Sequence, residues 1–273
     1  MIRLIKTTLH YHTFKKPFFI AAALLVFLGL KAYSNDMGSF AIEPLSYGIP
    51  LVCAVVFLNT HTENQSGAYR NKITAGYTRR QVFFSGIISA AACGAALFLV
   101  PAIPIYTSLG TPQTFLTMLM LYVLTAVITA CINLNTTSTI TTVFTVFLIA
   151  AVCFAAAEPV QEELKVEKYD YRFICDESKL QTQGVDGAYT VIEFPNPEYP
   201  TGVKRAALKT LAYTNPYSQV LYSELMLSDF YNTSNIQPKE LNHEYLFFPL
   251  ISAALACAVS ALSYLSYSKK DLR

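Results

Sequence analysis

The chain contains six runs of mostly apolar residues, each close to the length that a helix needs to cross a membrane. The runs cover approximately residues 17–34, 44–60, 82–108, 113–132, 138–157 and 245–267. A helix of about 20 apolar residues spans a hydrocarbon core, and its backbone polar groups are all paired within the helix. The runs lack the polar–apolar alternation of membrane-barrel strands. The sequence therefore predicts an α-helical integral membrane protein with six transmembrane helices.

Composition supports this fold class and argues against a nucleic-acid partner. Only 14% of the 273 residues are charged, whereas soluble domains carry about 25%. The formal net charge is only +2, so there is no overall positive charge of the kind that binds nucleic acid. Membrane lipid is the expected surrounding.

The positions of Lys and Arg predict the orientation. With six crossings, both termini lie on the same side as the connections 61–81 and 133–137. That side carries eleven basic and two acidic side chains, a net charge of +9, whereas the short opposite connections near 35–43 and 109–112 have no Lys or Arg. Basic residues accumulate on the cytoplasmic side of membrane proteins. We therefore expect a multi-pass protein with both termini in the cytoplasm.

The stretch 158–244 is then extracellular, between the fifth and sixth transmembrane helices. It is too long to be a structureless connection, and we expect a small α+β domain. The alternation over 169–173 and the run 188–194 predict strands, and helices are expected over 203–213 and 217–230. Residues 245–273 would form the sixth transmembrane helix and a basic cytoplasmic tail.

The sequence offers no pattern typical of an enzyme or a metal site. It lacks the HExxH, GxSxG and phosphate-loop motifs, and its six cysteines show no metal-ligand spacing. The four histidines are dispersed, and His10 and His12 are interpreted as side chains at the membrane interface. Five of the six runs also lack ionisable residues in their interiors, which ion-coupled transporters need. We expect no cofactor in this chain, and any transport would take its energy from another chain.

The connection 61–81, called the 61–81 segment below, has the signals of a short helix between two membrane helices. Thr62 with Gln65 and Thr78 with Gln81 match the capping-box pattern. Gly76 suits the position just after a helix end. These signals predict a cytoplasmic helix of about three turns, a tight glycine turn and the next membrane helix.

The side chains of this helix suggest a surface for a partner. We expect a charged face, formed by Glu63, Arg70 and Lys72, to be available to a cytosolic protein, while Tyr69 and Ile73 share another face because they are four residues apart. The alternative is a basic loop that follows the topology rule and binds anionic lipid.

The 61–81 segment resembles the first cytoplasmic loop of ABC-2 type permeases, the membrane-spanning subunits of two-component ABC exporters. The family pattern E…G-x-x-R-N-K-[apolar]-x-x-G-x-[ST]-R is matched by the stretch from Glu63 to Arg79. In that family the loop is a coupling helix that contacts the ATPase. The resemblance implies that the contact is shaped by six residues, Glu63, Gly67, Arg70, Asn71, Lys72 and Gly76.

The resemblance extends to the N-terminus and to the number of crossings. Residues 1–16 would be an interfacial amphipathic connecting helix, with Ile2, Ile5 and Leu9 on its apolar face. Residues 17–157 would hold the first five transmembrane helices together with the 61–81 segment. The large 158–244 region departs from many simple members of the family.

The function implied is that of a permease subunit of an ATP-driven exporter in a bacterial cell membrane. It would form the translocation path as a dimer, with a second copy or a paralogous permease. It would bind a cytosolic ABC ATPase, expected in two copies, which would hold the ATP and Mg. The enlarged loop suggests peptide or antimicrobial export. The alternative is a non-transporting membrane sensor or scaffold with a ligand-binding extracellular domain.

Overall fold

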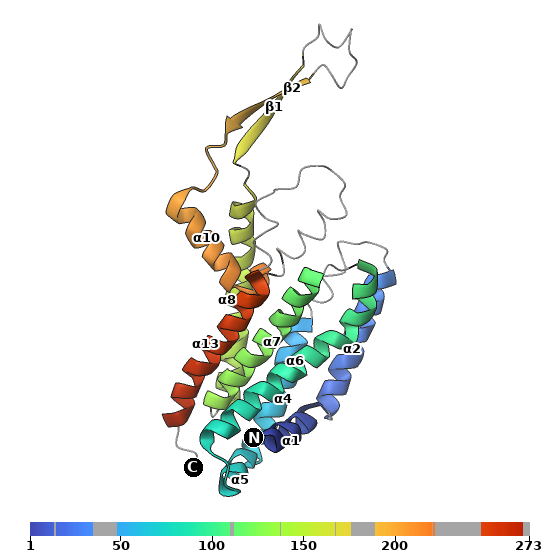
Figure 1. Cartoon of the computed structure of the whole chain (residues 1–273), viewed down its shortest axis with the longest axis vertical. Coiled ribbons are helices and arrows are strands. Elements are labelled where there is room, and N and C mark those ends of the chain that lie inside the picture. Colours follow the sequence, from blue (N-terminus) through green and yellow to red (C-terminus); the bar gives the residue numbers. More distant parts are fainter. Residues whose placement is uncertain are drawn as a thin grey trace.

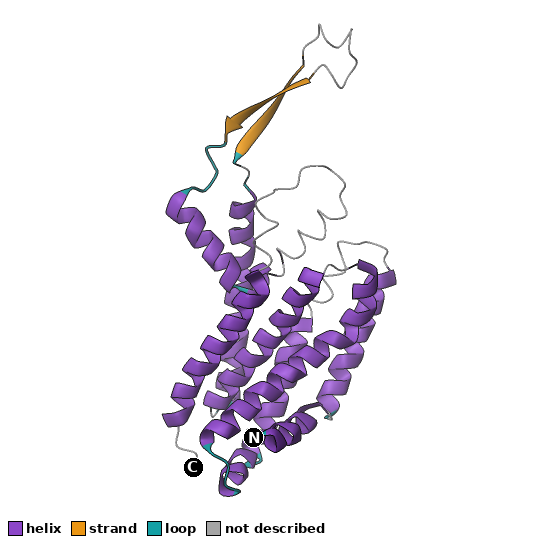
Figure 2. Ribbon diagram, viewed as in Figure 1, coloured by secondary structure: helices purple, strands orange, loops and turns teal. Residues whose placement is uncertain are grey.

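A computed structural model describes residues 1–13, 15–34, 48–109, 112–136, 138–166, 168–175, 189–219, 221 and 247–269. The described part is mostly helical (Figure 1, Figure 2). Its helices are α1 (Ile2–Thr13), α2 (Lys16–Ser34), α4 (Gly48–Gln65), α5 (Ala68–Thr74), α6 (Arg79–Leu109), α7 (Pro112–Asn135), α8 (Thr139–Lys165), α10 (Gly202–Thr214) and α13 (Phe248–Lys269), and its strands are β1 (Tyr169–Cys175) and β2 (Tyr189–Pro195).

Four helices of the described part are long and apolar enough to cross a membrane. Their candidate spans are Arg79–Val100 in α6, Phe115–Asn135 in α7, Thr139–Leu164 in α8 and Phe248–Lys269 in α13. They correspond to the predicted third to sixth crossings. The first predicted run contains a shorter apolar stretch, Lys16–Phe27 in α2. The helical membrane-protein character is therefore supported by four helices, and the number of six stays a prediction.

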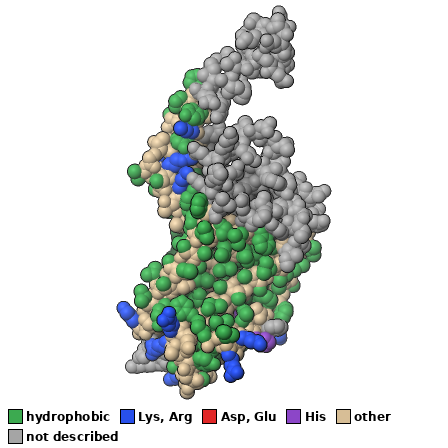
Figure 3. Space-filling view, viewed as in Figure 1, with side chains coloured by type: hydrophobic (Ala, Val, Ile, Leu, Met, Phe, Trp, Pro, Cys, Tyr) green, Lys and Arg blue, Asp and Glu red, His purple; other side chains and the backbone are tan. Residues whose placement is uncertain are grey.

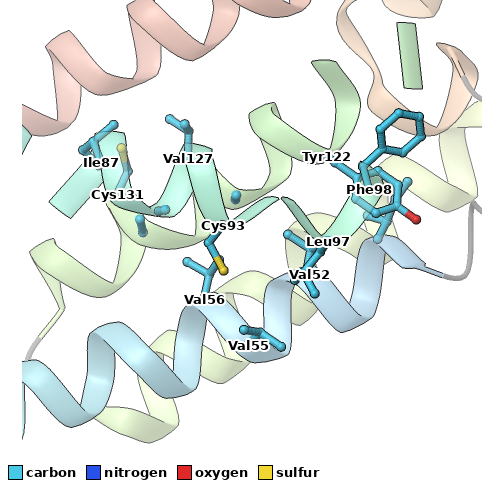
Figure 4. Close-up of a cluster of buried hydrophobic side chains, with 14 of the residues drawn as sticks. Val52, Val55, Val56, Ile87, Cys93, Leu97, Phe98, Tyr122, Val127 and Cys131 are labelled. Carbon is cyan, nitrogen blue, oxygen red and sulfur yellow. The ribbon is translucent and has the colours of Figure 1, made fainter. Parts of the chain in front are cut away.

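The core lies where α6 and α7 pack together and are covered by α2, α4 and α13. Small and branched side chains from α4, α6 and α7 meet there, among them Val52, Cys93 and Val127 (Figure 4). Gly94 of α6 sits directly against α7, because a Cβ at this position would lie 2.8 Å from the Tyr122 carbonyl oxygen. Small residues let membrane helices approach closely, and Gly94 sets the contact between these two helices.

The two strands predicted after α8 are present and pair as an antiparallel hairpin. β1 pairs with β2 in a register that places Tyr169 opposite Pro195 and Cys175 opposite Tyr189. The two strands project away from the helices (Figure 1). α10 confirms the helix expected over 203–213 and packs against α8 and α13 through Val160, Ala212 and Phe248. α8 continues to Lys165, beyond its expected end at 157.

Only part of the expected helix over 217–230 can be compared with the structure. Residues 216–219 are helical, and most of the remaining range lies outside the described residues, as do the tail residues 270–273. The hairpin and α10 contain the strand and helix types expected of an α+β region. Its extracellular location stays a prediction.

Candidate functional site

The 61–81 segment contains a helix of only two turns, held between two glycines with left-handed backbone. α4 continues to Gln65, and Gly67 then turns the chain with φ 68° before α5 begins. α5 ends at Thr74 and Gly76 follows with φ 92°. A Cβ at either glycine would meet nothing within 4 Å. Glycine is therefore needed at both positions for the backbone conformation, not for space.

Of the two predicted capping boxes, one is confirmed and one is wrong. Thr78 and Gln81 exchange hydrogen bonds, from the Thr78 amide to Gln81 Oε1 (2.9 Å) and from the Gln81 amide to Thr78 Oγ1 (3.2 Å). Thr62 instead lies inside α4, and its hydroxyl donates to the Leu58 carbonyl. No helix-breaking residue separates 48–60 from 61–65, so α4 simply continues, and the expected three-turn helix is reduced to α5.

The turn after α5 has the double hydrogen bond of a Schellman motif. The Gly76 amide donates to the Ile73 carbonyl (2.9 Å) and the Tyr77 amide donates to the Lys72 carbonyl (3.2 Å). The prediction of Gly76 as the residue after the helix end is confirmed. The direction in which the chain leaves α5 toward α6 is thereby fixed by backbone bonds.

The carboxylate of Glu63 is buried beneath α5, contrary to the expectation that it belongs to an exposed charged face. Glu63 is 3% exposed. Its Oε1 lies 2.7 Å from Lys72 Nζ and its Oε2 lies 3.5 Å from His12 Nε2. The expectation is wrong because Glu63 and Lys72 face each other across the Gly67 turn. They join α4 to α5.

The charge of Glu63 is stabilised by its neighbours. Burial acts to raise the pKa of this carboxyl, but the contacts with His12 and Lys72 outweigh burial and hold the pKa below its ordinary value. Burial, followed by the nearby Glu63 charge, raises the pKa of Tyr69 well above its usual range. The site therefore holds a carboxylate next to a neutral phenol at ordinary pH.

The same cluster binds α1 to the 61–81 segment. Lys72 Nζ donates to Thr8 Oγ1 (3.1 Å) and Asn59 Nδ2 donates to the His12 carbonyl (2.9 Å). We call the side chains of Thr8, His12, Asn59, Glu63 and Lys72 the buried polar cluster. Because an unpaired buried charge is strongly destabilising, the cluster fixes how α1, α4 and α5 sit relative to one another.

Sequence reasoning missed His12, Thr8 and Asn59 as members of this cluster. Leu4, Thr8 and His12 are the buried residues of α1, whereas Ile2, expected on its apolar face, is 84% exposed. Leu4, Thr8 and His12 follow one another at a spacing of four residues and therefore lie on one face of α1. That periodicity was a usable signal that His12 is an inward-facing side chain.

The other predicted residues of α5 are divided between its outer surface and its inner face. Arg70 and Asn71 are exposed, Lys72 is largely covered and Tyr69 is buried, while Ile73 packs against the core. The predicted apolar face of Tyr69 and Ile73 is confirmed. Of the three charged residues expected to be available to a partner, Arg70 alone is exposed.

Basic side chains gather at the end of the molecule that contains α5 (Figure 3). Arg79 and Arg80, at the start of α6, are exposed, and Arg79 Nη1 donates to the Ser268 carbonyl at the end of α13 (3.3 Å). The surface around Arg70 is therefore positively charged. Such a surface can bind an acidic protein face or anionic lipid.

The described residues contain no group of three or more His, Cys, Asp or Glu side chains placed to hold a metal ion. His12 and Glu63 are adjacent, but the third neighbour is the Lys72 ammonium, which a bound cation would have to displace. The chemistry of the site is accordingly that of an ion pair between helices. Comparison of the chain with family models, with curated proteins and with solved structures finds no match.

Proposed function

We propose that the chain is the permease subunit of an ATP-driven exporter, and that α5 receives force from a separate ATPase. The observation that carries the proposal is the buried ion pair between Glu63 and Lys72, 2.7 Å apart. It makes α5 a rigid extension of α4 that presents Arg70 and Asn71 outward. A helix fixed in this way can pass a displacement to the helices that hold it.

The proposed path of movement follows the contacts of α5. Lys72 links α5 to Thr8 of α1, and the Schellman turn at Gly76 links it to α6. A push on the exposed side of α5 would therefore move α1, α4 and α6 together. In a dimer, such motion would switch the membrane helices between inward-facing and outward-facing states, with ATP and Mg held by the ATPase.

The test is purification from native membranes with the charge at Arg70 reversed. We expect the unmodified chain to copurify with an ATPase that has a phosphate loop. In Arg70→Glu, association should fall about tenfold, as expected for reversing one interfacial charge. Lys168→Glu, an exposed reversal near the hairpin, is the matched control. Transport and ATPase association that survive Arg70→Glu would refute the proposed contact.

Internal coupling can be tested separately at Lys72. Lys72→Met keeps most of the side-chain length but removes the charge that holds Glu63. We expect it to retain ATPase association, since Arg70 and Asn71 remain exposed, and to reduce the stimulation of ATP hydrolysis by the permease. The alternative function, a non-transporting sensor or scaffold, predicts that no ATPase accompanies either protein.

A further inference from the structure

α8 contacts the described bundle near its start and again from its middle to its end. Near its start, Thr139 Oγ1 lies 3.0 Å from His61 Nε2 of α4. Farther along, Asn215 Nδ2 donates to the Cys153 carbonyl (2.7 Å), and the Tyr217 ring packs edge-on against Phe154 at a centroid distance of 5.7 Å. Between these two attachments, α8 stands away from α4 and α7.

The space between them is a cavity of about 590 Å³. Its walls come from α4, α7 and α8 and include Cys53, Ala54, Ile128, Ala150 and Phe154. Among the described residues that line it, none carries a charge, and the polar ones are Thr125, Thr129 and Tyr217. The volume is in the range of about 300–1,000 Å³ typical of ligand-binding pockets.

We propose that this cavity holds an acyl chain of a membrane phospholipid. An apolar cavity of this kind does not retain water and binds apolar molecules instead. The cavity lies alongside the candidate spans of α7 and α8, where hydrocarbon is the surrounding medium. The inference does not rest on the proposed permease function.

The contacts at the two ends of the cavity favour a hydrocarbon chain over a helix from a second copy. The cavity follows α8 from Val143 to Phe154, about 16 Å at the rise of an α-helix. Thr139 bridges α8 to His61 of α4 before this stretch begins, and the Tyr217 ring lies against Phe154 where it ends. A membrane-spanning helix is longer than this stretch and would have to displace these contacts, whereas a hydrocarbon chain can end between them.

The proposal is tested with the full-length protein in lipid nanodiscs that contain a phosphatidylcholine with a diazirine on one acyl chain. After irradiation, the labelled residues are identified by mass spectrometry. We expect labels on Cys53 of α4 and Ile128 of α7, in addition to exposed residues such as Phe144 of α8. Labels on Phe144 without labels on Cys53 and Ile128 would overturn the proposal.

Two variants fill the cavity from opposite walls, Ala54→Phe from α4 and Ala150→Phe from α8. Labelling of Ile128 should fall about tenfold in each, because displacing two buried methylenes of the chain removes about that much binding, while labelling of Phe144 is unchanged. Ala156→Phe, at an exposed position outside the lining, should leave both labels as they are. Equal labelling of Ile128 in all three variants would refute the assignment.

If a second copy of the chain filled the cavity, cross-linking would give a different result. Cys53 and Cys153 both line the cavity and are free thiols. If a helix of another copy filled the space, a short bifunctional maleimide would join the two chains through Cys153, and the lipid label would be absent from Ile128. That outcome would replace the lipid with a partner chain and disprove the proposal.

Discussion

α7 and α8 are almost equally apolar but occupy different surroundings. Their candidate spans have mean hydropathies of 2.3 and 2.4, yet 56% of the α7 span is buried within the chain and only 11% of the α8 span. Hydropathy reports the preference of a side chain for leaving water. It does not distinguish a protein neighbour from lipid, because lipid tails are as apolar as leucine. Apolarity alone therefore predicts that both helices leave water, but not which of them is packed.

The two helices differ in how closely their side chains fit against neighbouring helices. α7 meets α6 at Gly94, where the backbones approach closely, and Tyr122 of α7 packs on Phe98 of α6 at a ring distance of 5.2 Å. α8 turns large side chains outward, with Phe144 63% exposed and Val152 59% exposed. α7 is held by closely fitting side chains, whereas α8 is held by a polar contact at its start, by Asn215 and Tyr217 at its middle and by apolar contacts of Val160 with α10 and α13.

The largest difference in unfolding free energy is expected between the alanine variants of two phenylalanines. Phe83 of α6 is fully buried and packs against the rings of Tyr264 and Tyr267 in α13. Phe83→Ala should lower the free energy of unfolding by about 4 kcal/mol, the cost of a large cavity. Phe144→Ala should change it by less than about 0.5 kcal/mol. Unfolding in detergent micelles measures both, and similar losses would show that α8 is also packed.

Removing the buried carboxylate should have the next largest effect. Glu63→Gln leaves Lys72 and His12 without their charged partner, and we expect a loss of about 3 kcal/mol in unfolding free energy. Gln81→Glu, at the confirmed capping box, is a control that changes charge at the same end and should be near neutral. If Glu63→Gln left the free energy of unfolding unchanged, the buried polar cluster would not be what fixes α5.

The lowered pKa of Glu63 predicts that the stability of the fold depends on pH. Because the pKa of Glu63 is lowered in the folded protein, its charge stabilises the fold above the ordinary carboxyl pKa. This contribution is lost as the pH falls through the lowered value. The stability difference between the unmodified protein and Glu63→Gln should therefore shrink on acidification below pH 4.5, the ordinary value. A difference that stays constant down to pH 2 would contradict this assignment.

The smallest effect is expected at two hydrogen bonds of α8, one at its start and one at its middle. Thr139→Val removes the contact with His61, and Asn215→Ala removes the bond to the Cys153 carbonyl. Each should cost about 1 kcal/mol, the usual net value of one hydrogen bond. Thr145→Val, which only loses a bond within α8, is the control. If Thr139→Val and Asn215→Ala cost no more than Thr145→Val, contacts other than these would hold α8 in place.

Much of the local structure was predictable from the sequence because it depends on neighbouring residues. The helices over 82–108, 113–132 and 245–267 follow from long apolar runs, and the turn at Gly76 follows from glycine just past a helix end. The first strand follows from alternation over 169–173. The length of α5 was overestimated because the pattern of Thr62 and Gln65 also fits the interior of a continuing helix.

The buried polar cluster could not be predicted in the same way. It joins residues separated by 47 and 64 positions, and their pairing depends on how α1 packs against the bundle. Charged side chains near a membrane boundary are usually solvated, so Glu63 was expected on the surface. Only the positions of Leu4, Thr8 and His12, spaced by four, indicated which face of α1 turns inward. The distinction between α7 and α8 is likewise absent from their hydropathy.

The amide of Asn59 caps the end of α1 by binding the carbonyl of His12, one of the last carbonyls that a helix leaves without an internal partner. A helix of 12 residues is marginal on its own in water. During synthesis α1 emerges before α4 and α5, so Asn59 and Lys72 follow only after α2 has been made. The C-terminal end of α1 can therefore be completed only after the ribosome has synthesised the residues of α4 and α5 that bind it.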